Sequence, residues 1–124
     1  MATRRTATTR KRHADCSFGC PVEAALEVVG GKWKGVILFH LRDETRRFNE
    51  LRRLIPGVSQ RMLTKQLREL EEDQIVHRKI YREIPPKVEY SLTSFGLTLT
   101  PTLVALQEWG IEYLETVSEL RSRA

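Results

Sequence analysis

The sequence lacks the long apolar runs and leader segments that membrane-bound and secreted proteins carry. Its longest apolar run, residues 36–39, is far too short to span a bilayer. The arginines near the N-terminus are followed by no apolar stretch, so no secretory signal is predicted. The sequence also has no glycine-rich phosphate loop, nucleophile elbow or zinc-protease helix. These absences predict a cytoplasmic protein with no membrane partner, no cofactor and no enzymatic activity.

What is present is an excess of basic residues in an otherwise ordinary composition. The 124 residues are enough for one domain, and 40% hydrophobic with 30% charged residues is typical of a soluble globular chain. The 21 Lys and Arg outnumber the 16 Asp and Glu, which gives a net charge of +5. This balance favours a polyanionic partner such as nucleic acid or an anionic membrane surface, although a basic protein without such a partner has the same charge.

The first 14 residues contain basic side chains and no acidic ones. The cations are Arg4, Arg5, Arg10, Lys11 and Arg12, set among threonine and alanine. This composition predicts a disordered basic arm over residues 1–14 that can lie along DNA phosphates, or a tail without a role. Residues 15–124 are predicted to form the single domain.

Three short helices are predicted ahead of the central motif, at residues 21–29, 32–41 and 48–54. Pro21 suits the first position of a helix, and Gly30 with Gly31 is expected to stop it. Apolar residues recur at helical spacing in each segment, so Val36 and Leu54 are expected to face the core. The Pro56-Gly57 pair then predicts a tight connection to the next helix.

A fourth helix is predicted over residues 59–73, with Ser59 as its N-cap. At 100° per residue, Leu63, Leu67 and Leu70 form one stripe. The nearly opposite side carries side chains that donate or accept hydrogen bonds: Gln60, Arg61, Thr64, Lys65 and Arg68.

A helix lying in the major groove of DNA requires this division between a buried side and a cationic side. Arg and Lys can reach guanine O6 and N7, and Gln can pair with adenine. Hydroxyl groups and the helix N-terminus can hold phosphates. An ordinary helix with one solvated face has the same pattern, so the residues that follow matter for the interpretation.

A β-ribbon is predicted directly after this helix. Residues 75–81 and 88–92 are rich in β-formers and alternate in polarity, and a basic, proline-stiffened loop joins them. Arg82 and Lys87 are expected near its tip, where they can touch the DNA backbone or minor groove. A plain surface hairpin is the alternative, but a helix-turn-helix followed by such a ribbon is typical of winged DNA-binding domains.

The C-terminal stretch predicts a long helix over about residues 97–121. Its apolar residues step alternately by four and three positions, the pattern of helices that pair. The expected dimer interface comprises Leu99, Leu103, Leu106, Trp109, Gly110, Tyr113, Val117 and Leu120. Packing back onto the same domain is the alternative. A two-fold dimer would set two recognition helices about 34 Å apart, so that they read a pseudo-palindrome.

From Cys20 to about Gly110, the chain resembles the HxlR family of winged-helix regulators, relatives of the MarR-type repressors. The resemblance implies an α+β, mostly α fold: a winged helix-turn-helix with a two-stranded β wing and a long dimerisation helix. It also implies a dimeric repressor or activator with residues 59–73 in the DNA groove. The segments that carry it are residues 20–23, 30–33, 47–51, 55–59, 63–64, 67–71, 85–90, 92–93 and 109–110.

The chain departs from the family pattern at Gln74, where the family usually has glycine after an acidic residue. A positive φ at this position would strain a residue that has a side chain. The turn into the first wing strand is therefore the least certain connection of the predicted fold.

The two cysteines, Cys16 and Cys20, raise the question of a signal. Cys20 precedes Pro21 and is predicted to be an N-cap, where the helix dipole favours a reactive thiolate. Some family members use a cysteine here to sense oxidants or electrophiles, in some cases with a partner near the C-terminus of the other subunit, which this chain lacks. A Cys16–Cys20 bond, a bond across the dimer, a mixed disulfide and an inert thiol all remain open. His13 with both cysteines is an incomplete ligand set, so no metal site is predicted.

The sequence therefore predicts a sequence-specific regulator of transcription that acts on double-stranded DNA as a homodimeric repressor. A small-molecule or oxidant effector is expected to control it. Two alternatives remain open at this point. The winged domain can instead dock on an acidic protein through the same basic helix face. The regulator can also respond to a small apolar ligand held in the dimer interface near Trp109.

Overall fold

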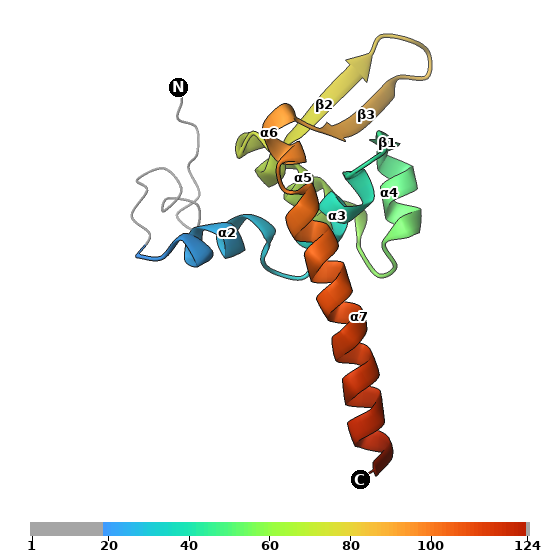
Figure 1. The fold of residues 1–124 in the computed structure, drawn as a ribbon. Coiled ribbons are helices and arrows are strands. Elements are labelled where there is room, and N and C mark those ends of the chain that lie inside the picture. The colour runs from blue at the N-terminus through green and yellow to red at the C-terminus, as the bar shows by residue number, and fades with distance from the viewer. Residues whose placement is uncertain (1–18, 124) are drawn as a thin grey trace.

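The computed structural model describes residues 19–123, which form a winged helix-turn-helix with a long C-terminal helix (Figure 1). The elements follow in the order α2 (Pro21–Val29), α3 (Lys34–Leu41), β1 (Arg46–Arg47), α4 (Phe48–Leu54), α5 (Gln60–Glu72), β2 (Val76–Tyr81), β3 (Lys87–Leu92), α6 (Ser94–Leu97) and α7 (Thr100–Arg123). The predicted mostly helical fold is confirmed. The predicted basic arm, His13 and Cys16 lie outside the described residues.

The sheet has three antiparallel strands in the order β1-β3-β2, so the prediction of only two strands was incomplete. Strands β2 and β3 pair along their full length, from Val76 opposite Leu92 to Tyr81 opposite Lys87. The additional strand β1 is two residues long and pairs with Glu89 and Tyr90 of β3. Because β1 is so short, its sequence carries no alternating pattern, and only pairing with a distant strand defines it.

The core lies where α3, α4 and α5 meet the base of the wing. Its most completely buried side chains are Ile37, Leu38, Leu51, Leu63, Leu67, Leu70 and Val76. Two predicted core positions are wrong, because Val36 is 41% exposed and Leu54 is 38% exposed. Both lie on helices of only seven or eight residues, in which helical spacing alone defines the inner face poorly.

The turn between α5 and β2 has the backbone conformation that the sequence made doubtful. Gln74 has a φ of 66°, a left-handed value that glycine adopts more readily. The Thr93 hydroxyl donates a hydrogen bond to the Gln74 carbonyl at 2.7 Å and accepts one from the Gly96 backbone N–H at 2.8 Å. Thr93 therefore links the end of α5 to the start of α6.

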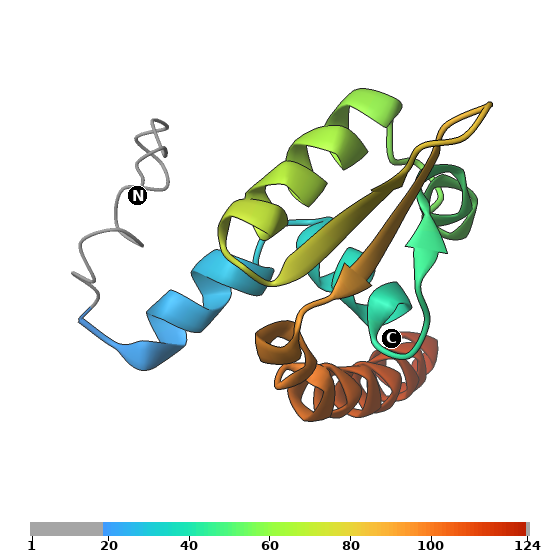
Figure 2. The same cartoon turned by 90° about the horizontal axis from the view of Figure 1, so that it is seen from above.

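Two elements extend away from the core. Figure 1 shows α7 projecting from the body on the side opposite to the wing, and α2 standing out laterally. No residue of α2 is buried, and Leu103 is the buried residue of α7. Seen from above, β2 and β3 run beside α5, and their connecting loop reaches beyond the body (Figure 2). Within residues 19–123, no helix combines the length and apolar character that crossing a membrane requires.

Candidate nucleic-acid interface

The recognition helix α5 begins where its N-cap was predicted. The Ser59 hydroxyl accepts a hydrogen bond from the Met62 backbone N–H at 3.0 Å, which satisfies one of the free donors of the first turn. Before it, Gly57 adopts a φ of 89° and lets the chain turn sharply out of α4. The helix-turn-helix is thus set by a turn residue and a cap that are two positions apart.

The two sides of α5 differ as the sequence predicts. Leu63, Leu67 and Leu70 are each at most 1% exposed and hold the helix against the core. On the other side, Arg61, Lys65 and Arg68 are exposed. The structure therefore presents a row of cations on a helix whose back is fixed by packing.

The polar residues beside this row differ in what they can offer a ligand. Gln60 is exposed, and Ser59 keeps a hydroxyl hydrogen for a phosphate while its oxygen caps the helix. Thr64 is half-buried, and its hydroxyl donates to the Gln60 carbonyl at 2.8 Å. In this conformation Thr64 can only accept a further hydrogen bond, so it is the weakest of the predicted contacts.

Two ion pairs fix the orientation of α5. Lys34 of α3 is buried and lies 2.7 Å from Glu69, measured between Nζ and Oε1. Arg78 of β2 lies 3.2 Å from Glu71 through its Nε. Buried charges are tolerated when they are paired, so Lys34 anchors the back of α5 to α3. Sequence reasoning missed this contact because the two residues are 35 positions apart in the printed chain.

The wing carries a small cluster of charges around Tyr81. The ammonium groups of Lys79 and Lys87 lie 4.8 and 4.4 Å from the centre of the Tyr81 ring. The Tyr81 hydroxyl donates to Glu89 at 2.9 Å, and Lys87 lies 3.7 Å from the same carboxylate. These contacts hold Lys87 half-buried on the strand, whereas Arg82 is exposed in the loop.

Tyr90 lies at the base of the wing, close to the cationic side of α5. Burial is the largest influence on the pKa of Tyr90 and raises it. Glu71 also raises this pKa, whereas Arg78 and Arg68 lower it by a smaller amount. The phenol therefore stays protonated at neutral pH. The influence of Arg68 on this pKa reflects how near the base of the wing lies to the cations of α5.

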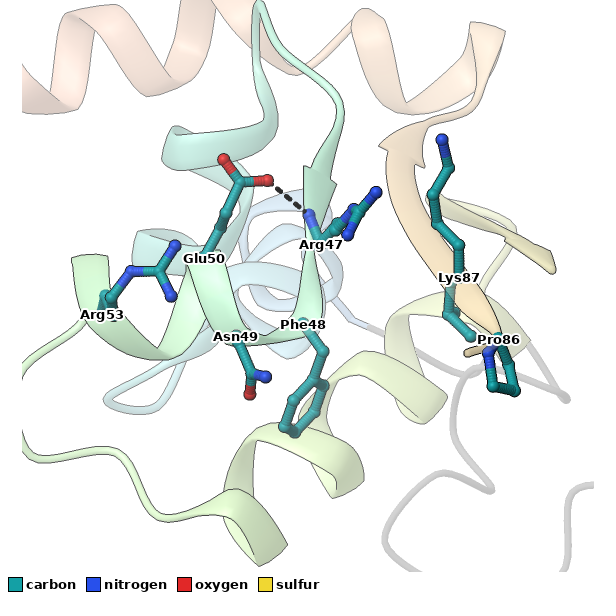
Figure 3. A pocket seen from close by; sticks show the side chains of 8 residues that line it. Arg47, Phe48, Asn49, Glu50, Arg53, Pro86 and Lys87 are labelled. Carbon is teal, nitrogen blue, oxygen red and sulfur yellow. Dashed lines mark hydrogen bonds between the residues drawn. The ribbon is translucent and has the colours of Figure 1, made fainter. Parts of the chain in front are cut away.

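A basic hollow of about 410 Å³ separates α4 from the wing, and we call it the α4–wing hollow. Arg47, Asn49 and Arg53 line it on the α4 side, and Pro86 and Lys87 line it on the wing side (Figure 3). Arg47 and Arg53 were not predicted as site residues. The adjacent arginines at 46–47 and 52–53 were the available signal, since two pairs of cations stand at and within one short helix.

Cys20 occupies the N-cap of α2, as predicted. Its backbone is extended, with φ −141° and ψ 132°, and its carbonyl accepts hydrogen bonds from the Glu23 and Ala24 N–H groups. The thiol is free and exposed. Cys16 lies outside the described residues, so the structure gives no distance between the two cysteines.

The predicted interface residues of α7 fall into two groups. Leu103 is 3% exposed and belongs to the core of its own chain, with Leu99 packed against it. Leu103 therefore has almost no surface left for a partner, whereas Leu99, just before α7, stays partly exposed. Gly110 and Val117 are partly exposed, and the larger side chains further along α7 are exposed: Leu106, Trp109, Tyr113, Leu114 and Leu120. Trp109 and Tyr113 stack on each other with ring centres 5.4 Å apart.

A second, apolar hollow of about 270 Å³ lies between α3 and α7. Val36 and Phe39 line it from α3, and Leu103 and Leu106 line it from α7, with Lys32 and Gln107 at its edge. Trp109, near which a ligand pocket was predicted, is not part of its lining. Among residues 19–123, no three His, Cys, Asp or Glu side chains gather as metal ligands.

Known proteins similar to this chain are regulators of transcription rather than enzymes. The sequence profile of the HxlR-like helix-turn-helix family matches residues 28–118. The uncharacterized HTH-type transcriptional regulator YdeP of Bacillus subtilis strain 168 is 54% identical over 104 residues, which cover 84% of this chain and 81% of that protein. The family profile spans the helix-turn-helix, the wing and most of α7.

Solved structures of the redox regulator HypR are similar in fold and in sequence. Its reduced form superimposes with a TM-score of 0.77 and 54% identity, over 81% of this chain and 99% of that one. Its oxidized form gives a TM-score of 0.72 and 59% identity, over 75% of this chain and 96% of that one. Both matches cover nearly all of HypR, so the likeness extends over the whole fold and beyond the helix-turn-helix.

Proposed function

This chain belongs to the HxlR-like helix-turn-helix family of transcriptional regulators, and we propose that it represses transcription as a homodimer bound to a pseudo-palindromic operator. The observation that carries the proposal is the row of exposed cations Arg61, Lys65 and Arg68 on a helix whose other side is fully buried. A regulator of this kind acts on the chromosome, so we expect it in the cytoplasm.

Each part of the interface has a distinct chemical task in this proposal. Arg61, Lys65 and Arg68 reach base edges and phosphates in the major groove, and Gln60 is suited to adenine. Ser59 and the N-terminus of α5 bind a phosphate. The exposed Arg82 and the half-buried Lys87 extend the contact along the wing to the minor groove or backbone. The predicted basic arm, residues 1–14, would add contacts to phosphates.

The exposed apolar side of α7 supports the homodimer. Trp109 is 63% exposed and Leu114 is 67% exposed, although both are large apolar residues on one helix. A contiguous apolar surface of this kind on a small domain marks an interaction site. Pairing of two α7 helices would cover Leu106, Tyr113, Val117 and Leu120 and would place two recognition helices on one face of a duplex.

A gel shift with the DNA upstream of the protein's own gene tests this function. We expect the protein to shift this duplex in preference to a random one, and to lose most of its affinity between about 50 and about 200 mM salt because counterions are released. Arg61→Ala and Arg68→Ala should each weaken the free energy of DNA binding by about 1–3 kcal/mol and should reduce the preference for the upstream sequence. Arg121→Ala, at the far end of α7, serves as the control of equal charge change.

The outcomes separate DNA binding from the alternative of a protein-docking module. Unchanged affinity in Arg61→Ala and Arg68→Ala would show that another face binds the DNA. No salt-dependent binding to any duplex would favour an acidic protein partner for the same helix face. Footprinting beside the gene, with transcription measured in the same assay, distinguishes repression from activation.

A second part of the proposal concerns the signal: we infer that Cys20 responds to oxidants. Its exposed free thiol at the positive end of α2 supports this, as does the similarity to a redox regulator. Two thiols treated with diamide would lose two protons and two electrons, forming one S–S bond and the reduced hydrazine. The bond can join Cys16 to Cys20, join Cys20 to its equivalent in the partner, or link Cys20 to a small thiol.

Mass spectrometry and gel shifts before and after mild diamide treatment test this inference. We expect a loss of free thiol and a changed DNA affinity in the wild type, both absent in Cys20→Ser. Cys16→Ser abolishes only the bond within one chain, and the intact mass separates the other two products: a bond across the dimer doubles the chain mass, whereas a mixed disulfide adds the mass of the small thiol. Free thiols and DNA affinity that stay unchanged in the wild type would end the redox hypothesis.

A small apolar effector is the remaining candidate signal. The apolar hollow between α3 and α7, which we call the α3–α7 hollow, is large enough for a compact ligand. It adjoins the exposed side of α7, where the predicted interface begins. A Val36→Trp substitution would fill it. If such an effector controls the regulator, this variant should bind DNA normally but no longer respond to the compound, which a screen by thermal shift would identify.

A further inference from the structure

The recognition helix and the tip of the wing leave one strongly basic part of the surface without a task. The α4–wing hollow has Arg47, Asn49, Arg53 and Lys87 in its lining, and residues 19–123 leave it open (Figure 3). Its cations come from the segment before α4, from α4 and from β3. Such convergence of like charges in a concave surface is costly unless an anion binds there.

The local charges leave the hollow positive. Its lining contains the carboxylate of Glu50, but an oxygen of that group accepts the Arg47 backbone N–H at 2.8 Å and caps α4. Lys87 is shared with Glu89, 3.7 Å away. Among the described residues, the guanidinium groups of Arg47 and Arg53 are in no ion pair, and both residues are exposed.

The hollow continues toward the recognition helix. A neighbouring hollow of about 420 Å³ shares Asn49 and Arg53 with it and adds Arg52, Gly57 and Val58. Val58 directly precedes Ser59, the N-cap of α5. A continuous basic path therefore leads from the wing, across the side of α4, to the point where the recognition helix begins. An extended polyanion suits such a path better than a single small anion does.

We propose that the α4–wing hollow binds the phosphate backbone of the duplex, with Arg47 and Arg53 as sequence-independent contacts. This inference rests on the proposed function and adds to it a binding surface outside the recognition helix. Arginine presents a planar fork of donors that fits phosphate oxygens in pairs. In helix-turn-helix proteins the first helix crosses the DNA backbone, and α4 is that helix here. Backbone contacts of this kind set the register of the protein without reading bases.

The test compares salt dependence and sequence preference in matched variants. Arg47→Gln, Arg53→Gln and the double variant each lose guanidinium charge, and Arg121→Gln loses the same charge at the far end of α7. Binding of labelled upstream and random duplexes of equal length is measured by anisotropy over a range of salt. Thermal melting of each variant checks the fold, and Arg53→Gln alone decides the matter if the double variant is unfolded.

We expect each single variant to weaken binding by about tenfold on both duplexes, the double variant to weaken it by about a hundredfold, and all three to leave the ratio of the two affinities unchanged. The slope of log K against log[salt] should fall by about 0.9 for each lost contact. Arg53→Lys should restore the slope but only part of the affinity, because lysine lacks the fork. Arg121→Gln should match the wild type in every measurement.

Three results would overturn the inference. Slopes and affinities equal to those of Arg121→Gln would show that no phosphate binds in the hollow. A loss confined to the upstream duplex would assign Arg47 and Arg53 to base reading instead. Tight binding of an acidic peptide without weakening on duplexes would identify a protein partner. Absence of salt-dependent DNA binding in the wild type itself would count against the proposed function and not specifically against the hollow.

Discussion

Helices α5 and α7 both carry leucines at helical spacing, yet the two helices use them differently. In α5, Leu63, Leu67 and Leu70 are all buried in the core. In α7, Leu103 is buried, whereas Leu114 and Leu120 are more than half exposed. The same periodicity therefore specifies an apolar face in both helices without specifying what covers it.

The comparison shows which interactions a single chain can complete. The core holds α5 on the side opposite its cations, and the Lys34–Glu69 and Arg78–Glu71 ion pairs hold it at its two flanks. Beyond its first turns, α7 projects past the core, so most of its apolar side has no covering element within the described chain (Figure 1). Mutations in the two helices should consequently differ in whether they change the folding of one chain or the association of two.

The largest effect is expected for Leu67→Ala in α5. Leu67 is 1% exposed, so truncation removes buried apolar surface and leaves a cavity. We expect a loss of about 2–5 kcal/mol in the free energy of unfolding, measured by urea denaturation. Leu103→Ala in α7 should fall in the same range, since Leu103 belongs to the same core. A loss below the range in either variant would contradict the assignment of that residue to the core.

A somewhat smaller effect is expected for Glu69→Gln. The substitution keeps the size of the side chain but leaves the buried Lys34 ammonium without the carboxylate that lies 2.7 Å away. We expect the free energy of unfolding to fall by about 1–3 kcal/mol. Lys34→Met with Glu69→Gln should recover part of that loss, because the unpaired charge is removed as well. Equal stability of the single and double variants would argue against the ion pair as an anchor.

Leu114→Ala in α7 tests the other side of the comparison. Leu114 is 67% exposed, so the stability of one chain should change by no more than about 0.5 kcal/mol. If α7 pairs with a second copy, the free energy of dimer association should weaken by about 1–2 kcal/mol. The dimer dissociation constant measured by sedimentation should then rise roughly tenfold. Leu120→Ala provides a second exposed apolar position on α7, and Glu108→Gln, about 120° around the helix from both leucines, is an exposed control. Dissociation constants that do not move would place the interface elsewhere.

The smallest effect is expected at the C-terminal end of α5, for Gln74→Gly. Gln74 has a φ of 66°, where a side chain is strained and glycine is not. Because glycine also adds freedom to the unfolded chain, we expect a net gain of only about 0.5–1 kcal/mol in the free energy of unfolding. Decreased stability would show that the Gln74 side chain contributes more than its backbone costs.

Much of the fold and of the recognition helix could be predicted from local sequence signals. Ser59 as N-cap, the helix to Glu72 and the two long wing strands follow from capping and periodicity, which act within a few residues. The extended Cys20 before Pro21 follows from the restriction that proline places on its neighbour. Gln74 adopts a positive φ at the position where the family usually has glycine, although the absence of glycine had made that turn uncertain.

The features that the sequence did not predict depend on contacts between distant segments. Strand β1 exists only through pairing with Tyr90 and Glu89, and the Lys34–Glu69 pair forms only when α3 and α5 pack. The α4–wing hollow likewise combines Arg53 with Lys87 from a strand much later in the chain. No periodicity or local motif carries this information, because it arises from the packing of elements already formed.

The length of α7 has a consequence for how two copies would be arranged. Its 24 residues correspond to about 36 Å of helix, comparable to one turn of DNA. In a pair joined along these rods, a change of about 10° in their crossing would displace each head by about 6 Å, as for any lever of that length. The Thr93 hydrogen bonds tie the end of the recognition helix to α6, the short helix directly before the rod, so part of that swing would be passed on to the recognition helix. The crossing angle of the two α7 helices, which lies far from the bases, would then determine the spacing between the half-sites that the dimer can bind.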